Sequence, residues 1–258
     1  MQITLLQAVI IGLWTAFCYS GMLWGIFTNR DLVLSFGVGI VCGDLKTALQ
    51  CGAIAELAFM GFGVGAGGTV PPNPIGPGII GTLMAITMDG VTPESALSLS
   101  IPFAVAIQFL QTAIYTVRAG APESANNALK KQDFGKFRLH SNLTILLFAL
   151  VGFLLGFLGA YSMDTLSKLV ALVPAWLLKG LTVAGGMLPA IGFAMIMSVM
   201  LKKEVVPFAL LGYFLAAYLG VPVIGIVGTV FALKHYNDAG NVAVAQAATE
   251  EVEHDDWI

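Results

Sequence analysis

The sequence predicts an all-α, polytopic membrane protein in which full transmembrane helices are mixed with re-entrant or broken helical hairpins. Hydrophobic residues make up 57% of the 258 residues and charged residues only 10%, against about 25% charged residues in ordinary soluble domains. The apolar residues form long runs, and the charges gather near the ends of those runs. Because a spanning helix needs about 20 apolar residues, the chain has room for roughly six to nine complete or partial crossings. We expect a single membrane transport domain over residues 1–236.

The apolar runs differ in length, and this difference predicts two kinds of helix. The runs Ile3–Thr28, Ala96–Val117 and Leu143–Tyr161 are long enough for complete crossings. Two others, Leu32–Gly43 and Ile75–Met88, are nearer the length of about 10 to 14 residues that fits re-entrant or buried segments. A mixture of complete and half crossings is typical of transporters.

Charge predicts the orientation of the chain. The polar segment 118–142 carries five Lys or Arg residues and only two acidic residues, so the positive-inside rule predicts a cytoplasmic loop. Residues 237–258 end in the acidic run "ATEEVEHDDWI", which predicts a poorly ordered tail on the cytoplasmic side. The net charge of −3 does not indicate a nucleic-acid partner.

The stretch Gly65–Gly81, "GAGGTVPPNPIGPGIIG", interrupts the apolar pattern with six glycines and four prolines. Proline lacks an amide donor and disfavours α geometry in the preceding residue, so this stretch is not expected to be a continuous helix. Irregular backbone at membrane depth survives only where protein buries it or where it lines a wet cavity. We therefore expect a substrate-binding site here, with Thr69, Pro71 and Asn73 among its contacts. The alternative is a structural loop packed on a neighbouring helix and capped by Asn73.

Glu56, in "CGAIAELAFMGFG", is the only ionisable residue between Lys46 and the end of the Gly/Pro stretch. An acid at the bilayer centre is costly, so it is expected to face the protein interior and to have a partner. Three roles remain open for it: a carboxylate that accepts hydrogen bonds from sugar hydroxyls, a brace for the broken loop, and a proton carrier with a raised pKa.

Neither a catalytic residue nor a metal or cofactor site is expected. Cys18, Cys42 and Cys51 lie in apolar runs without metal-ligand spacing and are expected to be small buried hydrophobes. His140 and the two other histidines lie in or beside polar segments and are expected to be solvated. Glu56 has no acidic neighbour within a helical turn, so an intramembrane enzyme is not indicated.

Three segments carry a resemblance to a known family: "ITLLQAVIIGLW", "GVGIVCGDLKTALQCGAIAELAFMGFGVGAGGTVPPN" and "GLTVAGGMLPAIGFAMIM". From Ile3 to about Leu233 the chain resembles the membrane IIC subunit of the mannose/fructose/sorbose family of the bacterial phosphotransferase system. The resemblance implies a multi-pass protein of the bacterial cytoplasmic (inner) membrane that imports a sugar together with a IID membrane subunit. It also implies phosphorylation of the sugar by cytoplasmic IIB and IIA subunits, and assembly as a trimer of IIC/IID pairs. This chain would then carry the sugar path and do no chemistry itself.

One departure from the mannose-type pattern bears on the substrate. Where mannose-type members read more like Ala-Pro-Asp, this chain has "VPPNP", closer to the subgroup that handles N-acetylgalactosamine and related amino sugars. An amide side chain such as that of Asn73 can both donate to and accept from an acetamido group. The best expectation is therefore an N-acetylgalactosamine or related amino-sugar IIC subunit. The alternative is an ion-coupled secondary transporter of a small polar solute, which would also explain broken helices and a buried acid.

Overall fold

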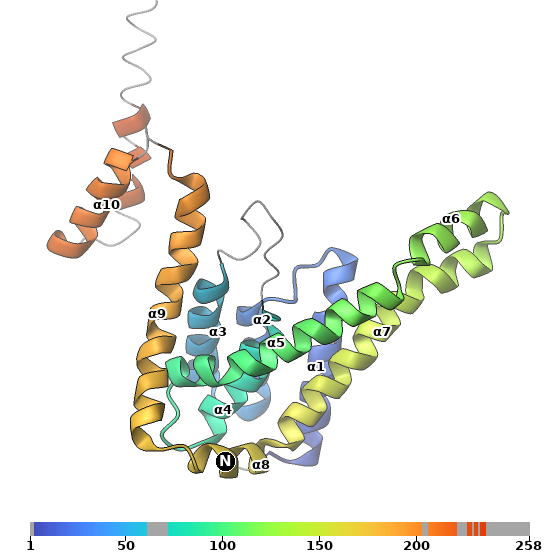
Figure 1. Ribbon diagram of the computed structural model, residues 1–258, viewed down its shortest axis with the longest axis horizontal. Coiled ribbons are helices and arrows are strands. Elements are labelled where there is room, and N and C mark those ends of the chain that lie inside the picture. Colours follow the sequence, from blue (N-terminus) through green and yellow to red (C-terminus); the bar gives the residue numbers. More distant parts are fainter. Residues whose placement is uncertain are drawn as a thin grey trace, which may run out of the picture. The chain divides into compact units, whose positions relative to one another are not determined.

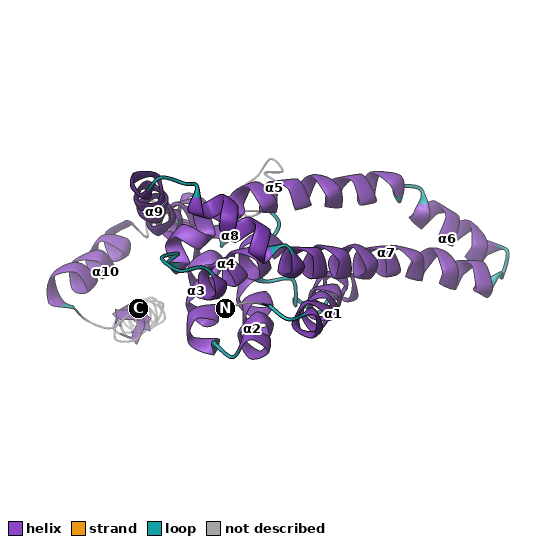
Figure 2. Cartoon of the chain, turned by 90° about the horizontal axis from the view of Figure 1, so that it is seen from below, coloured by secondary structure: helices purple, strands orange, loops and turns teal. Residues whose placement is uncertain are grey.

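The computed structural model describes residues 3–60, 72–202, 206–220, 226–228, 230–231 and 233–235. Within these ranges every regular element is a helix (Figure 2). The chain forms two compact units, residues 1–198 and 199–258. The predicted tail, 237–258, lies outside the described residues. The predicted fold class, an all-α membrane protein, is confirmed.

Among the described residues, four helical stretches are long and apolar enough to cross a membrane: Leu5–Trp24, Pro93–Lys130, Phe134–Tyr161 and Ala175–Met200. They correspond to α1 (Leu5–Gly21) with the short 3₁₀ turn η1 (Met22–Trp24), α5 (Pro93–Val117) with α6 (Ala121–Lys130), α7 (Phe134–Tyr161) and α9 (Ala175–Met200). Shorter apolar helices lie among them, including α2 (Asp31–Cys42) and the joined segment Gly76–Thr87. Both short runs singled out in the sequence therefore form short helices.

Helices α1 and α7 lie side by side, and small residues make this contact close (Figure 1). The buried face of α7 consists of residues spaced four apart: Phe148, Gly152, Gly156 and Ala160. A Cβ atom at Gly156 would collide with the Thr15 side chain and come 3.0 Å from the carbonyl oxygen of Ile11. Small residues at this spacing let helix backbones approach closely in a bilayer, where van der Waals packing drives association.

Helices α2 and α3 (Leu45–Phe59) form a tight hairpin. Gly43 ends α2 in the left-handed conformation, with φ of 77°, and its N–H donates to the carbonyl oxygen of Gly39. Asp44 then caps α3, accepting from the backbone N–H of Thr47 at 3.1 Å. A left-handed glycine followed by an N-cap acid is a compact way to reverse a helix.

The Gly/Pro stretch is helical over its second half, so the expectation of irregular backbone as far as Gly81 is wrong for residues 75–81. Gly76–Gly81 form a π-helix, η2, that continues into α4 (Thr82–Thr87). Pro77 lies in the first turn of η2, where its missing N–H costs no hydrogen bond. Residues 61–71, with the predicted contacts Thr69 and Pro71, lie outside the described residues.

Glycines allow η2 to sit between α2 and α5. A Cβ atom at Gly76 would come 2.6 Å from the Cα of Ala104 in α5, and one at Gly78 would come 2.7 Å from the Cβ of Leu34 in α2. All six residues of η2 are buried. The glycines that predicted a break in the helix therefore also allow η2 to pack closely against its neighbours.

The basic segment 118–142, expected to be a loop, is mostly helical. It contains α6 and the first nine residues of α7, which form a helical hairpin beyond the end of α5 (Figures 1 and 2). Pro122 lies in the first turn of α6, and Asp133 caps α7 by accepting from the backbone N–H of Lys136 at 3.0 Å. Charged residues in this hairpin are good helix formers, and their polarity alone does not predict a loop.

The remaining helices complete the two units. The short helix α8 (Met163–Ala171) ends before Pro174, and α9 begins at Ala175. Pro174 separates these two helices, because proline disfavours α geometry in the residue before it. In the second unit, α10 (Val206–Leu219) contains no buried residue.

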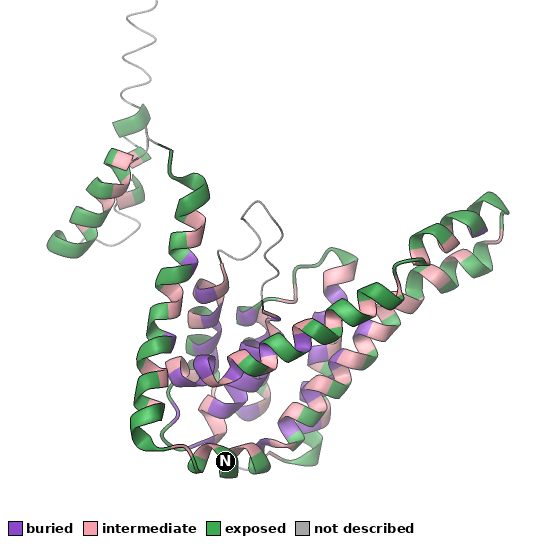
Figure 3. Ribbon diagram, viewed as in Figure 1, coloured by how far each residue is buried: buried purple, intermediate pink, exposed green. Residues whose placement is uncertain are grey.

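Burial within the first unit is concentrated in α1 to α5 and α7, while α9 is mostly exposed (Figure 3). Only Gly185 and Gly192 are buried in α9, and its exposed side chains include Trp176, Ile191 and Met197. An apolar exposed helix of this length fits contact with lipid or with another membrane subunit.

We expect Gly156→Val to weaken the packing of α1 against α7, because the added side chain meets Thr15 and Ile11. Overpacking of this kind costs about 1–3 kcal/mol. The thermal unfolding midpoint of the detergent-solubilised chain measures the effect. The matched control is Gly180→Val in α9, where an added Cβ meets nothing within 4 Å. Equal midpoints for the two variants would contradict this packing assignment.

Candidate functional site

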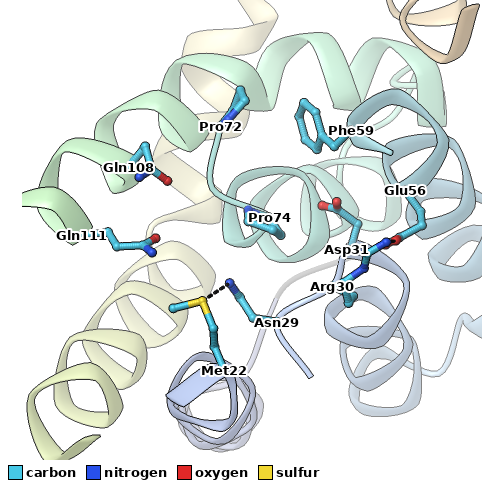
Figure 4. A pocket seen from close by; sticks show the side chains of 10 residues that line it. All are labelled: Met22, Asn29, Arg30, Asp31, Glu56, Phe59, Pro72, Pro74, Gln108 and Gln111. Carbon is cyan, nitrogen blue, oxygen red and sulfur yellow. Dashed lines mark hydrogen bonds and ion pairs between the residues drawn. The ribbon is translucent and has the colours of Figure 1, made fainter. Parts of the chain in front are cut away.

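A cavity of about 260 Å³ lies where the start of α2, the end of α3, the chain entering η2 and the middle of α5 meet (Figure 4). Its described lining consists of ten residues: Met22, Asn29, Arg30, Asp31, Glu56, Phe59, Pro72, Pro74, Gln108 and Gln111. This volume is near the lower end of the range of about 300–1,000 Å³ for small-molecule sites. The cavity therefore suits a compact polar solute.

Glu56 and Arg30 form an ion pair inside this cavity. Arg30 is the N-cap residue of α2, and Glu56 lies in the last turn of α3, so the pair joins the two ends of the hairpin that are remote from Gly43. The Glu56 side chain is 20% exposed and that of Arg30 is 53% exposed. Arg30 is thus the partner that a membrane-embedded acid at position 56 requires.

Asp31 is a cavity residue that the sequence analysis missed. It is the first residue of α2 and only 2% exposed. It also lies within electrostatic range of both Arg30 and Glu56. Arg30 and Asp31 stand between two apolar runs, where charges are ordinarily solvated, so their position does not indicate that Asp31 is buried. The available signal was an acid in the first turn of a short apolar helix, where the helix dipole favours a negative charge.

Several acceptor oxygens in the cavity lack a partner among the described residues. They are Oδ1 of Asn29, Oδ1 of Asp31 and Oε2 of Glu56. All three are buried, although buried polar atoms are normally hydrogen-bonded. Arg30 and Glu56 carry the opposite charges of the ion pair, and Asp31 adds a second carboxyl group to the cavity. A cavity of this kind can accept several hydrogen bonds from a ligand that carries hydroxyl or amino groups.

The opposite wall of the cavity carries two carboxamides from α5, Gln108 and Gln111 (Figure 4). They are three residues apart and so lie on one face of the helix. The side chain of Asn73 holds Gln111: its Nδ2 donates to Oε1 of Gln111 at 2.6 Å. This bond occupies the oxygen of Gln111 and leaves its NH₂ group as a donor.

Asn73 itself is fully buried. Its Oδ1 accepts from the backbone N–H of Ile75 at 3.0 Å, and its own backbone N–H donates to the carbonyl oxygen of Ala104 at 3.1 Å. Asn73 therefore holds the chain just before η2 in place and ties it to α5. The residues on either side, Pro72 and Pro74, line the cavity, whereas Asn73 lies behind it.

Of the residues predicted for the site, the structure brings Glu56 into the cavity and places Asn73 in contact with the cavity residue Gln111. Arg30, Asp31, Asn29 and the two glutamines join them without having been singled out. The described part of the chain contains no group of three or more His, Cys, Asp or Glu residues that could hold a metal ion.

Comparisons with known proteins agree on one family. A family model described as the sorbose-specific IIC component of the phosphotransferase system (PTS) matches residues 5–234. The N-acetylgalactosamine permease IIC component 1 of Escherichia coli (strain K12) is 31% identical over 251 residues, which cover 95% of this chain and 93% of that protein.

Two solved structures share the fold. One, described as a membrane protein, has a TM-score of 0.80 at 26% identity and covers 92% of this chain and 97% of its own. The other is the mannose transporter ManYZ in complex with microcin E492, with a TM-score of 0.58, 26% identity and the same coverage of 92% and 97%. This chain belongs to the family of PTS sorbose-specific IIC components, the membrane transport subunits of the mannose/sorbose group.

Proposed function

We propose that this chain is the sugar-translocating IIC subunit of a phosphoenolpyruvate-dependent phosphotransferase system, and that the cavity between α2, α3 and α5 binds the sugar. The sugar is imported together with a IID subunit and phosphorylated by IIB, which receives its phosphate from IIA. One observation carries the binding-site proposal: the unpartnered buried acceptors Asn29, Asp31 and Glu56 surround one small cavity. A sugar supplies the hydroxyl donors that these oxygens lack.

Sugar recognition in this cavity divides between its two walls. The carboxyl groups of Asp31 and Glu56 accept from hydroxyl groups, and a hydrogen bond to Glu56, which is charged in its pair with Arg30, is about twice as strong as a neutral one. The carboxamides of Gln108 and Gln111 face them from α5 and offer donors to ring or hydroxyl oxygens. Phe59 adds an apolar surface for the face of the sugar ring.

We propose N-acetylgalactosamine or a related amino sugar as the substrate. An acetamido group presents one donor and one acceptor, and side-chain amides match both. Three side-chain amides line the cavity: Asn29, Gln108 and Gln111. The E. coli relative with 31% identity is an N-acetylgalactosamine permease component, which supports the same choice.

Asn73 contributes through Gln111 rather than by touching the sugar. Its Nδ2–H fixes Oε1 of Gln111, so that the NH₂ group of Gln111 is the part left for the ligand. Glu56 contributes directly, and its pairing with Arg30 holds one oxygen while the other stays available. The two predicted residues thus have different tasks at one site, and Thr69 and Pro71 remain proposed contacts from the adjoining segment.

The assembly we propose is a trimer of IIC/IID pairs in the bacterial inner membrane, with segment 118–142 and the tail in the cytoplasm. The exposed apolar surfaces of α9 and α10 support a partner within the membrane. The similarity to a chain of the mannose transporter ManYZ supports a second membrane subunit beside this one. The excess of Lys and Arg in segment 118–142 supports its cytoplasmic location.

The direct test of function is uptake of labelled N-acetylgalactosamine by cells that express this chain with IID, IIA and IIB partners. We expect the label to accumulate as sugar phosphate, and only when all the components are present. Accumulation of unmodified sugar that collapses with the ion gradient would instead indicate a secondary transporter. Failure to form the phosphate of any hexose tested would contradict the proposal.

Replacement of Glu56 tests the carboxylate role. Glu56→Gln should lower the apparent affinity for sugar by roughly 10- to 100-fold, because a charged acceptor is lost and Arg30 is left unpaired. Uptake at a series of sugar concentrations measures this change. The control is Glu123→Gln, which removes an exposed acid from α6. Normal uptake by Glu56→Gln would remove Glu56 from the site.

A double-mutant cycle tests whether Asn73 acts through Gln111. Asn73→Ala and Gln111→Ala should each reduce uptake, and the double variant should take up sugar no more slowly than the slower of the two single variants. Either change removes the positioned NH₂ group of Gln111, the first by releasing it and the second by deleting it. Uptake rates are normalised to the amount of chain in the membrane, which corrects for the lost hydrogen bond to Ile75. Losses that multiply would show that the two residues contribute independently.

A further inference from the structure

A second cavity, of about 390 Å³, lies between the end of α5, the start of α6 and the N-terminal part of α7. Its lining residues are Tyr115, Arg118, Ala119, Ala121, Pro122, Ala125, His140, Ser141 and Thr144. None of them belongs to the sugar cavity. We propose that this cavity binds the phosphate group of an anionic phospholipid at the cytoplasmic surface of the membrane.

Arg118 is held in the cavity wall with donors to spare. Its Nη2 donates to the carbonyl oxygen of His140 at 3.0 Å, and its Nε donates to Oγ1 of Thr144 at 3.2 Å. A guanidinium carries five N–H groups, so three remain for a ligand. These two bonds fix the plane of the guanidinium, and a fixed plane suits bidentate binding of a phosphate.

The charge of Arg118 is not neutralised by an acid within the described part of the chain, where the only two ion pairs are Arg30–Glu56 and Lys136–Asp133. Nζ of Lys136 and Oδ2 of Asp133 lie 3.0 Å apart. The hydrogen bond from the backbone N–H of Lys136 lowers the pKa of Asp133, which keeps this pair charged. The positive charge of Lys136 is thus paired with Asp133, whereas the guanidinium of Arg118 faces a cavity.

Other polar groups in the cavity also lack partners. Nδ1 of His140 is buried without a hydrogen bond to any described residue, whereas the residue as a whole is half-buried, so the expectation of a solvated histidine fails for this nitrogen alone. The side chain of Ser141 lines the cavity next to it. A guanidinium, a hydroxyl and an imidazole Nδ1 that carries its proton can each donate to a phosphate oxygen.

The position of the cavity along α7 matches the level of lipid phosphates. The apolar part of α7 starts at Leu143, and its preceding turns carry Lys136 and Arg138. All 28 residues of α7 span about 42 Å, more than the hydrocarbon core of about 30 Å, so the polar turns project into the headgroup region. His140 and Ser141 lie at this boundary.

The apolar part of the lining favours a lipid over a free anion. Tyr115 is 42% exposed and packs on Phe148, with ring centroids 5.2 Å apart. Tyrosine is enriched where headgroups meet the hydrocarbon core. Ala119, Ala121, Pro122 and Ala125 add apolar surface around the arginine. A phosphodiester with an attached glycerol backbone can contact both parts of this lining, whereas inorganic phosphate contacts only the polar part.

The test compares additives and variants on the purified full chain in detergent. Phosphatidylglycerol, phosphatidylcholine and inorganic phosphate are added separately, and the thermal unfolding midpoint and the lipid retained in native mass spectrometry are recorded. We expect phosphatidylglycerol to raise the midpoint and to be retained, with phosphatidylcholine giving a smaller effect. Inorganic phosphate is expected to have none. Equal effects of phosphate and phosphatidylglycerol would assign the site to a free anion and overturn the lipid proposal.

Two arginine variants separate a built site from general attraction to basic charge. Arg118→Gln should weaken phosphatidylglycerol binding by roughly ten-fold or more, since the charge-assisted hydrogen bonds of a positioned guanidinium to the phosphate are lost. Arg138→Gln removes a guanidinium from the same hairpin outside the cavity and should leave most of the binding. Equal losses in the two variants would overturn the proposal. Arg118→Lys, which keeps the charge without the planar fork, should also bind less than the wild type, and wild-type binding by it would contradict bidentate recognition.

Discussion

The ion pair between Arg30 and Glu56 is the interaction on which the cavity between α2, α3 and α5 depends. A charge at membrane depth is tolerated only when it faces the protein interior and has a partner. Here the partner comes from the start of α2 and the acid from the end of α3, so the pair fixes the open ends of the α2–α3 hairpin beside each other. The pair uses one oxygen of Glu56, and the other oxygen stays buried and unpartnered. The same contact therefore stabilises the fold and leaves an acceptor for a ligand.

Close packing of small residues gives this cavity its walls. Glycines in η2 let that helix reach the backbones of α2 and α5, and Gly152 and Gly156 bring α7 against α1. With these backbones in contact, the space that remains near Asp31 and Gln111 is small and polar. A π-helix next to this space fits the general association of π-helical turns with functional sites.

The sequence predicted the helices that have a long, uninterrupted apolar run. It was less informative where proline, glycine or charged residues favour one local structure and packing or capping favours another. Long apolar runs predicted the spanning helices, and the isolated acid at Glu56 indicated a residue that faces an interior partner. The prolines suggested irregular backbone throughout Gly65–Gly81, but glycine packing and a proline in the first turn allow a helix from Ile75. The polar residues of segment 118–142 suggested a loop. Instead the segment forms a helical hairpin, because Asp133 caps α7 and several of the charged residues favour a helix.

Most of the candidate site could not be predicted because it depends on contacts between distant segments. In the sequence, Asp31 is an ordinary charged residue at the start of a helix. In the structure it is buried because the chain around Gly78 and Glu56 of α3 lie next to it. Gln108 and Gln111 lie in the spanning helix α5, whose sequence does not distinguish them. They line the cavity because Pro72 and Pro74, from a distant part of the chain, line it with them. The hydrogen bond of Asn73 to Gln111 spans 38 positions in the chain, and no local pattern indicates it.

The most direct test of the account is a cryo-electron microscopy map of this chain with its IID partner and N-acetylgalactosamine. The account predicts sugar density in the cavity, with hydroxyl groups within hydrogen-bond distance of the Glu56 carboxylate and the NH₂ group of Gln111. Density for the sugar at another location, with this cavity holding only water and the Arg30–Glu56 pair unchanged, would contradict it.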